Sequence, residues 1–324
     1  MGYIPFDKIK EQALAIGFQD CGAISCSLQP IDEYKQWIKN GYEAGMQYLE
    51  SYIDVRENPA LLLEEGQSII SFVVSYNIKN SENKTISPLN VAQFSLYKDY
   101  HKKIKSKLYI LIACIQDFYP DFKARAFVDS APVLEKQIAK QCGLGFIGKN
   151  SCLISREFGN KILLGEIVTN YTTDYNTKEQ EDGCKACKAC LEACPNGAIL
   201  SNRTINANLC NSYHTIENKE NIPGKINLKN FVFGCDICLN ACPYSSKKIE
   251  ESKIMSRNVD MDFLLDSFKN NYFNKSVFNR AKRASPLGRI KYEKLLENIV
   301  STDKKEESTM QKLRLFFTSN NKVK

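Results

Sequence analysis

The sequence lacks a hydrophobic run that could cross a membrane. Its longest apolar stretches, at residues 68–76 and 108–115, are well short of the ~18–20 residues that a membrane-spanning helix requires. It also lacks a basic segment followed by an apolar stretch at its start, which a secretory signal would have. We therefore expect a cytoplasmic protein that does not insert into a membrane.

An excess of positive charge is lacking over most of the chain and is confined to its C-terminal quarter. The 324 residues carry a net charge of +7, and residues 246–324 alone contain 18 basic and 10 acidic side chains. The preceding three quarters of the chain are therefore close to neutral. The basic region is either a solvated tail or a surface that meets a polyanion such as RNA.

The first 170 residues alternate between helical and strand-like patterns. Some segments have apolar residues at helical spacing, and others are β-branched and apolar, as buried strands are. This mixture predicts an α+β fold with helices packed on a sheet. A polar stretch at 174–183 predicts a linker, and the pattern is helical from about Asp262 onward. The expected helices are 6–16, 104–118 and 131–142, and the expected strands are 68–76, 123–128 and 162–169.

Eight of the thirteen cysteines lie between residues 184 and 242. In a chain without an export signal, C-x-x-C spacing indicates metal binding rather than disulfides. The first group follows the spacing C-x-x-C-x-x-C-x-x-x-C-P from Cys184 to Pro195. This is the bacterial ferredoxin motif, in which three cysteines bind one 4Fe–4S cluster and the fourth binds another. A second group, C-x-x-C-x-x-x-C-P, runs from Cys235 to Pro243.

The second cysteine group lacks its first member, because Val232 occupies that position. Cys210 is the nearby thiol that is free to replace it, and eight cysteines then suffice for two 4Fe–4S clusters. Zinc is the alternative, since C-x-x-C pairs also form zinc ribbons. We expect the other five cysteines to be small core residues. The predicted ligands are Cys184, Cys187, Cys190 and Cys242 for the first cluster, and Cys194, Cys210, Cys235 and Cys238 for the second.

Residues 143–150, GLGFIGKN, contain glycines at the spacing of a nucleotide-binding loop. Such loops need a strand before the glycines and a helix after them. Here the expected order is reversed, with a helix entering and a strand-like segment leaving. Asn150 also replaces the Ser or Thr that a P-loop uses on magnesium. We therefore interpret the glycines as allowing a close backbone approach or a left-handed turn.

Two segments carry a resemblance to a known family. FVDSAPVLEKQIAKQCGLGFIGKN at 127–150 and LLGEIVTN at 163–170, followed by the ferredoxin motif, resemble epoxyqueuosine reductase. The resemblance covers roughly residues 5–295. It implies a cobalamin-dependent iron–sulfur oxidoreductase that performs the last step of queuosine synthesis on tRNA. Further matching positions are Trp37, Gly45, Met46, Arg56 to Pro59 and Asp99 to His101.

The resemblance also implies a domain organisation. It predicts a cobalamin-binding α/β catalytic domain at 1–173, a ferredoxin-like two-cluster domain at 174–250, and a short, basic, HEAT-like helical region at 251–324 that contacts tRNA. This sequence departs from the family near its end, where the usual basic segments are short or are replaced by Asp303–Glu307. The departure concerns the grip on tRNA more than the chemistry.

The resemblance assigns the proton donor to Asp129, in the VDSAP segment. An acid that faces an apolar corrin plane should be desolvated, so we expect its pKa to be raised. The alternative is a helix N-cap, because Asp129 lies between a predicted strand and a predicted helix. The implied cofactor contacts are Arg56, His101, Lys149, Asn150 and Ser151, and the implied tRNA contacts are Arg280, Lys282, Arg283 and Arg289.

The expected reaction is reduction of the epoxide of epoxyqueuosine to queuosine at the wobble position, with loss of water. The expected partners are the anticodon stem-loop of a tRNA with a GUN anticodon and an external low-potential electron donor, and nothing demands more than a monomer. One alternative is a corrinoid iron–sulfur reductase of a small organic substrate. Another is a plain ferredoxin-type electron carrier, which would bind no corrin.

Overall fold

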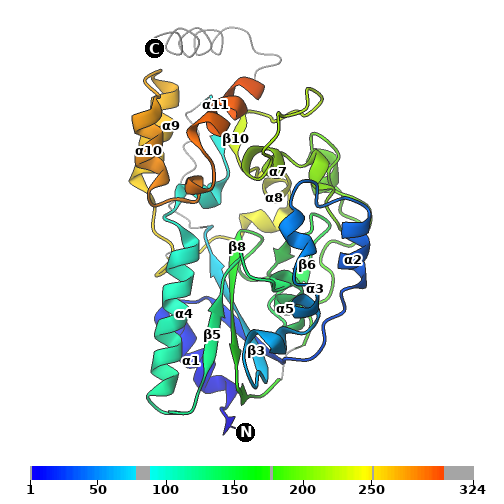
Figure 1. Cartoon of the computed structure of the whole chain (residues 1–324), viewed down its shortest axis with the longest axis vertical. Helices are drawn as coiled ribbons and strands as arrows, with labels where there is room; N and C mark the ends of the chain where they lie inside the picture. Colours follow the sequence, from blue (N-terminus) through cyan, green and yellow to red (C-terminus); the bar gives the residue numbers. More distant parts are fainter. Residues whose placement is uncertain (1, 78–87, 176–177, 250–251, 303–324) are drawn as a thin grey trace.

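The computed structural model describes residues 2–77, 88–175, 178–249 and 252–302 (Figure 1). Its centre is a four-stranded antiparallel sheet with the strand order β2-β3-β8-β5. Every residue of β3 is buried, as its run of apolar and β-branched residues predicts. The four strands are β2 (Asp20–Ser25), β3 (Ser68–Ser75), β5 (Ala124–Phe127) and β8 (Ile162–Thr169).

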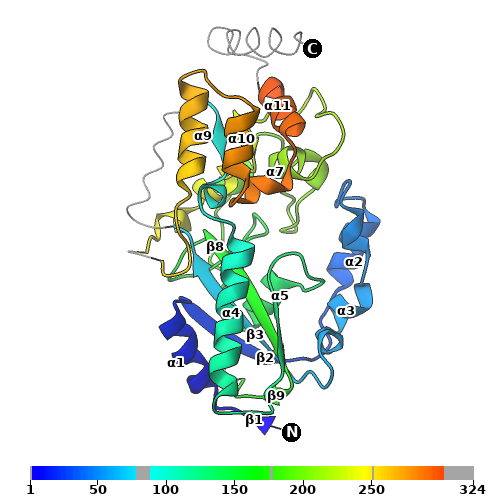
Figure 2. The same cartoon turned by 60° about the vertical axis from the view of Figure 1, so that its left-hand side comes forward.

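Helices cover both faces of this sheet (Figure 2). Ile70 and Phe72 of β3 belong to the core on one face, whereas Ile69 and Val73 belong to the core on the other. This alternation follows from the two-residue period of a strand. Helices α1 and α4 pack on the first face and α5 on the second. Their bounds are Phe6–Ile16 for α1, Tyr100–Gln116 for α4 and Glu135–Gln141 for α5.

The six helices and strands expected in the first 170 residues are all present, with shifted ends at two helices. The end of α1 is as expected, because Gly17 adopts a left-handed conformation there. Helix α4 begins four residues early, because the Asp99 side chain accepts a hydrogen bond from the His101 backbone N–H and caps it. Helix α5 begins later than expected, after Pro132, since the residue before a proline is disfavoured in helical conformation.

In the described residues, the other strands form three two-stranded sheets. In one of them, β4 pairs with β10, so the predicted catalytic domain and the predicted ferredoxin-like domain share hydrogen bonds. In another, β6 and β7 form a hairpin around residues 148–152. The bounds are β1 (Gly2–Tyr3) with β9 (Tyr171–Thr172), β4 (Asn90–Val91) with β10 (Phe231–Phe233), and β6 (Phe146–Ile147) with β7 (Leu153–Ile154).

Short helices form the segment between β2 and β3 and most of the cysteine region. Figure 2 shows α2 and α3 on the side of the molecule where α5 lies. The elements are α2 (Asp32–Lys39), η1 (Gln47–Glu50), α3 (Ile53–Glu57), η2 (Pro59–Leu62), η3 (Gln93–Leu96), α6 (Ala189–Ala193), η4 (Ala207–Leu209), α7 (Asn211–Ile216), α8 (Ile237–Asn240) and η5 (Pro243–Ser246).

The C-terminal part is helical, as expected, and lies at the end of the molecule beyond α4 (Figure 1). Its buried residues, including Leu264, Phe278 and Leu295, join the core that covers the first sheet face. Residues 303–307 lie outside the described part of the chain. Within the described part, no helix is both long and apolar enough to span a bilayer. The elements are α9 (Val259–Lys269), α10 (Lys275–Lys282), η6 (Pro286–Arg289) and α11 (Tyr292–Ser301).

Candidate functional site

Asp129 lies on an exposed loop between β5 and α5. Its backbone is left-handed, with a φ of +58°, a conformation that is unfavourable for most residues other than glycine. Helix α5 begins six residues later, and its N-cap position is Leu134. The N-cap alternative for Asp129 is therefore wrong, and the loop presents the carboxylate for another purpose.

Asp129 is bound by two residues from the first turn of α4. The Nε2 atom of His101 lies 2.8 Å from Asp129 Oδ2, and the Tyr100 hydroxyl donates to the same oxygen at 3.1 Å. The other ring nitrogen of His101, Nδ1, lies 2.8 Å from Asp99 Oδ1. The Tyr100 and His101 rings stack with their centroids 4.0 Å apart. The sequence named His101 as a cofactor contact, but it did not identify Tyr100 as a partner of Asp129.

The protonation of this cluster differs from the expectation for Asp129. The hydrogen bond from His101 lowers the pKa of Asp129, and this effect outweighs the desolvation of the carboxyl. Burial opposes the charge on His101, but its bonds to Asp129 and Asp99 prevail, and the pKa of His101 is raised. The expectation of a raised pKa for Asp129 is therefore wrong. Both shifts favour a proton on the imidazole over one on the carboxyl.

A bidentate ion pair stands beside this cluster. The Nε and Nη2 atoms of Arg289, in η6, each lie 3.0 Å from a carboxylate oxygen of Glu217, which follows α7. The charge of Arg289 is close enough to contribute to the lowered pKa of Asp129. The guanidinium also lies close enough to Tyr48, an exposed residue of η1, to affect the pKa of its hydroxyl. Arg289 was expected at the tRNA backbone, and the structure brings it to the edge of the Asp129 site.

The other three predicted tRNA contacts lie on or next to α10. Arg280 is engaged within the protein, because its Nε atom lies 2.6 Å from Asp260 and its guanidinium covers the Phe263 ring at 4.7 Å. The Lys282 ammonium lies over the Phe278 ring. Arg283 is exposed and has no ion pair with another described residue.

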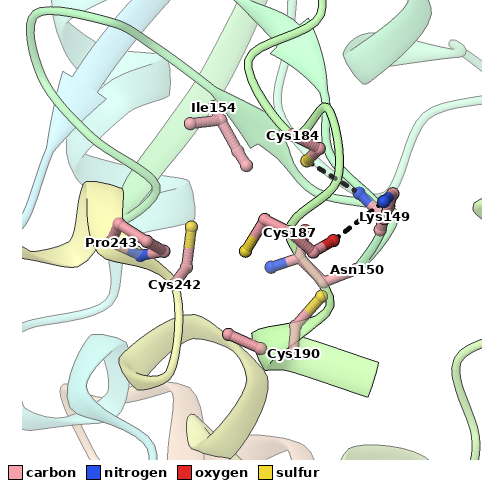
Figure 3. A pocket seen from close by; sticks show the side chains of 9 residues that line it. Lys149, Asn150, Ile154, Cys184, Cys187, Cys190, Cys242 and Pro243 are labelled. Carbon is pink, nitrogen blue, oxygen red and sulfur yellow. Dashed lines mark hydrogen bonds between the residues drawn. The ribbon is translucent and has the colours of Figure 1, made fainter. Parts of the chain in front are cut away.

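The four cysteines predicted to bind the first cluster line a single pocket, which Figure 3 shows from close by. They come from the loop before α6, from α6 itself and from the turn between α8 and η5. The backbone N–H of Lys149 donates to the Cys184 sulfur at 3.4 Å. The Lys149 ammonium donates to the carbonyl oxygens of Lys185 and Cys187 at 2.7 and 2.8 Å. This lysine therefore fastens the cysteine loop to the glycine-rich segment.

Asn150 lines the same pocket and carries an unpartnered donor. Its side chain is only 3% exposed, and its Nδ2 atom has no hydrogen-bond partner among the described residues. The Oδ1 atom accepts a hydrogen bond from the backbone of Cys152, which fixes the orientation of the amide. Figure 3 shows the nitrogen directed into the pocket. Ser151 is next in the chain, and its carbonyl accepts a hydrogen bond from Lys136.

The cysteines predicted to bind the second cluster also lie near one another. Cys210 and Cys235 are within electrostatic range of Cys194, and Cys238 is within range of all three. Among the described residues, no group of three or more His, Cys, Asp or Glu side chains is gathered closely enough to hold a single metal ion. The structure thus places Cys194, Cys210, Cys235 and Cys238 near one another, and their assignment to a second cluster stays a prediction.

Cys152 lies between the two cysteine sets. It is within electrostatic range of Cys190 and Cys242 in the first set and of Cys210 and Cys238 in the second. The two sets are therefore neighbours. Of the other cysteines expected in the core, two are buried and two are only partly buried, namely Cys21 and Cys142, and Cys26 and Cys114.

Arg56, the remaining predicted cofactor contact, is buried in α3. Its Nε atom has no hydrogen-bond partner among the described residues, and its guanidinium lies 5.4 Å from the centre of the Tyr34 ring. Four large apolar side chains of the same region are exposed to solvent, although such side chains are usually covered. They are Leu28, Tyr48, Tyr52 and Leu61.

Two family models match the chain. Residues 183–245 match the 4Fe-4S double cluster binding domain. Residues 56–130 match the family described as "Epoxyqueuosine reductase QueG, DUF1730". The first match covers all eight cysteines of the two sets and favours iron–sulfur clusters over zinc.

Similar proteins cover nearly the whole chain. Epoxyqueuosine reductase of Cyclobacterium marinum is 33% identical over 297 residues, which cover 90% of this chain and 94% of the relative. The Escherichia coli enzyme of that name is 32% identical and covers 90% of this chain and 79% of its own length.

Solved structures of epoxyqueuosine reductases also resemble this chain. Epoxyqueuosine reductase from Streptococcus thermophilus superposes with a TM-score of 0.78 at 26% identity, covering 98% of this chain and 86% of that one. An epoxyqueuosine reductase in complex with an epoxyqueuosine-modified stem loop of tRNA-Tyr superposes with a TM-score of 0.76 at 25% identity, covering 91% and 80%.

Proposed function

Since the chain belongs to the epoxyqueuosine reductase family, we propose that it reduces epoxyqueuosine in tRNA to queuosine, the last step of queuosine synthesis. One observation supports this proposal above the others. The same fold contains the Asp129–His101 pair, which can hold a proton, and two neighbouring sets of four cysteines. A relative of the same fold has been solved with an epoxyqueuosine-modified tRNA stem loop, which supports tRNA as the substrate.

The reaction requires two electrons and two protons, and it releases water. Amino-acid side chains do not supply such electrons, so bound cofactors must. The match to a double-cluster domain supports two 4Fe–4S clusters. The donor set fits them, because the buried Nδ2 of Asn150 and the backbone N–H of Lys149 face the first pocket, where cluster and cysteine sulfurs accept such bonds. We assign Cys184, Cys187, Cys190 and Cys242 to the first cluster, and Cys194, Cys210, Cys235 and Cys238 to the second.

Cobalamin is the cofactor that we propose at the substrate. The exposed apolar side chains of residues 28–61 fit a large ring that would cover them, and the unpartnered Nε of buried Arg56 fits a polar group of such a ligand. A reduced corrin would supply the strong nucleophile or electron donor that epoxide opening needs. We propose that Arg56 and His101 contact the cobalamin. The other proposed cobalamin contacts lie nearer the cysteine pocket and are Lys149, Asn150 and Ser151.

Asp129 and His101 supply one of the two protons that the reaction requires. The oxygen that leaves the epoxide carbon needs an acid, and the imidazolium of His101 holds a proton 2.8 Å from Asp129. Asp129 is the exposed member of the pair, so it is the group placed to meet the substrate and to pass the proton on. Tyr100 and Asp99 hold the two residues in register.

The proposed partners are a tRNA and an electron donor. Lys282 and Arg283 are the best candidates for phosphate contacts in the anticodon stem-loop, because Arg280 is paired within the protein. Because Arg289 lies close to Asp129, we assign it to the modified nucleoside rather than to the tRNA phosphates. We propose a cytoplasmic monomer that receives electrons from an external low-potential donor and recognises a tRNA with a GUN anticodon.

The test is an anaerobic reconstitution with iron, sulfide and cobalamin, followed by addition of epoxyqueuosine-containing tRNA and a low-potential reductant. Mass analysis of the nucleosides should show the loss of one oxygen atom, dependent on cobalamin. Binding of the corrin with unchanged tRNA would favour reduction of a small organic substrate instead. Assembly of the clusters without corrin binding would indicate that the protein is an electron carrier instead.

A further inference from the structure

A backbone hydrogen bond from the Ser130 N–H to the Val128 carbonyl oxygen and one side chain hold the left-handed backbone of Asp129. Its N–H donates a short hydrogen bond to Oε1 of Glu135, the first residue of α5. A left-handed conformation is unfavourable for an aspartate and persists only where its surroundings enforce it. Glu135 is therefore the side-chain contact that restrains this backbone, and with it the way the loop presents the Asp129 carboxylate to His101.

Glu135 is itself in contact with a second carboxyl group. Its side chain is in hydrogen-bond contact with that of Glu166, which is fully buried in β8. Oε1 of Glu166 accepts a hydrogen bond from the Ser71 hydroxyl at 3.1 Å, but Oε2 has no donor among the described residues. Two carboxylates cannot hydrogen-bond to each other without a proton between them.

We propose that Glu135 and Glu166 share one proton, and that this acid pair acts as a positioning device that holds the Asp129 loop in its left-handed conformation. Glu166 donates the shared proton, and Glu135, as the carboxylate, accepts both this proton and the N–H of Asp129. The positioning role rests on the proposed function of Asp129, whereas the shared proton does not.

The charges around the pair agree with one retained proton. Burial raises the pKa of Glu135 to about 7 and that of Glu166 well above its usual range. Asp129 adds negative charge beside the pair, and Lys136 on α5 is the opposing cation. Cys142 and Tyr100 also face it, from the end of α5 and from α4, and burial raises the pKa of each, so both stay neutral.

The shared proton makes stability depend on pH in a defined direction. The unfolded chain releases carboxyl protons near pH 4 to 5, whereas the folded pair retains one to about pH 7. The folded state therefore binds more protons across this window, and its stability falls as the pH rises through it. An amide at position 166 supplies the donor at every pH and should remove this dependence.

The first experiment measures the unfolding midpoint of the cluster-containing protein between pH 4.5 and 9 for wild type, Glu166→Gln and the exposed control Glu157→Gln. We expect a smaller decline across pH 5 to 8 in Glu166→Gln than in wild type, and no change in the control. An unaltered pH dependence in Glu166→Gln would overturn the shared proton, whatever reaction the protein performs.

The second experiment tests positioning by single-turnover reduction of epoxyqueuosine tRNA. Glu135→Ala removes the acceptor of the Asp129 N–H and should slow the reaction at least tenfold, with iron content and tRNA affinity unchanged. Glu135→Gln keeps an oxygen acceptor and should restore most of the rate. Equal rates in wild type and Glu135→Ala would overturn the positioning role, and failure of Glu135→Gln to exceed Glu135→Ala would do the same.

Discussion

The imidazole of His101 bridges two carboxylates, with Nε2 2.8 Å from Asp129 and Nδ1 2.8 Å from Asp99. Because both ring nitrogens face an acceptor, the doubly protonated ring is favoured, and the pKa of His101 is raised even though burial opposes its charge. Asp129 correspondingly has a lowered pKa. The acid that we propose for this site is therefore a pair, in which the histidine holds the proton and the aspartate is the more exposed member.

The first prediction concerns Asp129→Asn. This change removes one carboxylate from His101, so the pKa of the imidazole should move down toward its ordinary value of about 6.5. The acid form is present below that pKa and lost above it, so the alkaline fall in activity should shift to lower pH. At neutral pH we expect a loss of turnover of about 10²-fold or more. Single-turnover rates measured across pH check both effects.

Iron and cobalamin content serve as the control for Asp129→Asn, and both should equal those of wild type. Near-normal rates in this variant at every pH would remove Asp129 from the mechanism. A lower rate without a shift of the alkaline limb would show that His101 is not the acid whose titration limits the reaction.

The second prediction separates cations that have no ion pair with a described residue from one that is paired with a carboxylate at the C-terminal surface. Replacing Lys282 and Arg283 with Ala should weaken tRNA binding and reduce the slope of log affinity against log salt by about 0.7–0.9 for each lost phosphate contact. Arg280→Ala is the matched control, because its guanidinium is bound to Asp260 and covers Phe263. That variant should lose stability while its salt slope stays unchanged. Identical slopes in both variants would contradict the assignment.

Local patterns predicted the sheet core well. The expected strand 162–169 and the expected helix 6–16 have the bounds of β8 and α1. Both are long enough for periodicity to be read, and Gly17 marks the end of the helix. The short helices α2 and α3 were not expected individually, because five to eight residues give too little periodicity.

Contacts between distant segments could not be predicted in the same way. Arg289 and Glu217 are 72 residues apart, and only the folded chain pairs them beside Asp129. The pKa of Asp129 was expected in the wrong direction, because it depends on His101, which is 28 residues earlier. Cysteine spacing predicts local proximity more directly than it predicts contacts between distant segments, because each C-x-x-C unit lies within one loop and the helix beside it.

The third prediction concerns the buried amide of Asn150. Hydrogen bonds to cluster sulfurs stabilise the reduced, more negative cluster and raise its reduction potential. Asn150→Leu removes the Nδ2 donor at similar volume, so the potential of one cluster should become more negative while that of the other stays the same. Redox titration followed by electron paramagnetic resonance measures both. The exposed Asn202→Leu should change neither, and an equal shift of both clusters in Asn150→Leu would indicate a general disturbance instead.

The last prediction decides which residue completes the second cluster. Cys210 lies within electrostatic range of Cys194 and Cys235, whereas Val232, at the usual ligand position, is fully buried in the apolar core. Cys210→Ala should therefore lower the iron content from about eight to about four atoms per chain and leave the signal of the other cluster. Because the side chain at position 232 lies within the core, adding Val232→Cys to this variant should not restore the lost iron. The control Cys114→Ala, on α4, should keep about eight iron atoms per chain. A full iron complement in Cys210→Ala would show that another thiol holds the cluster, and Cys152, which lies between the two sets, would be the residue to replace next.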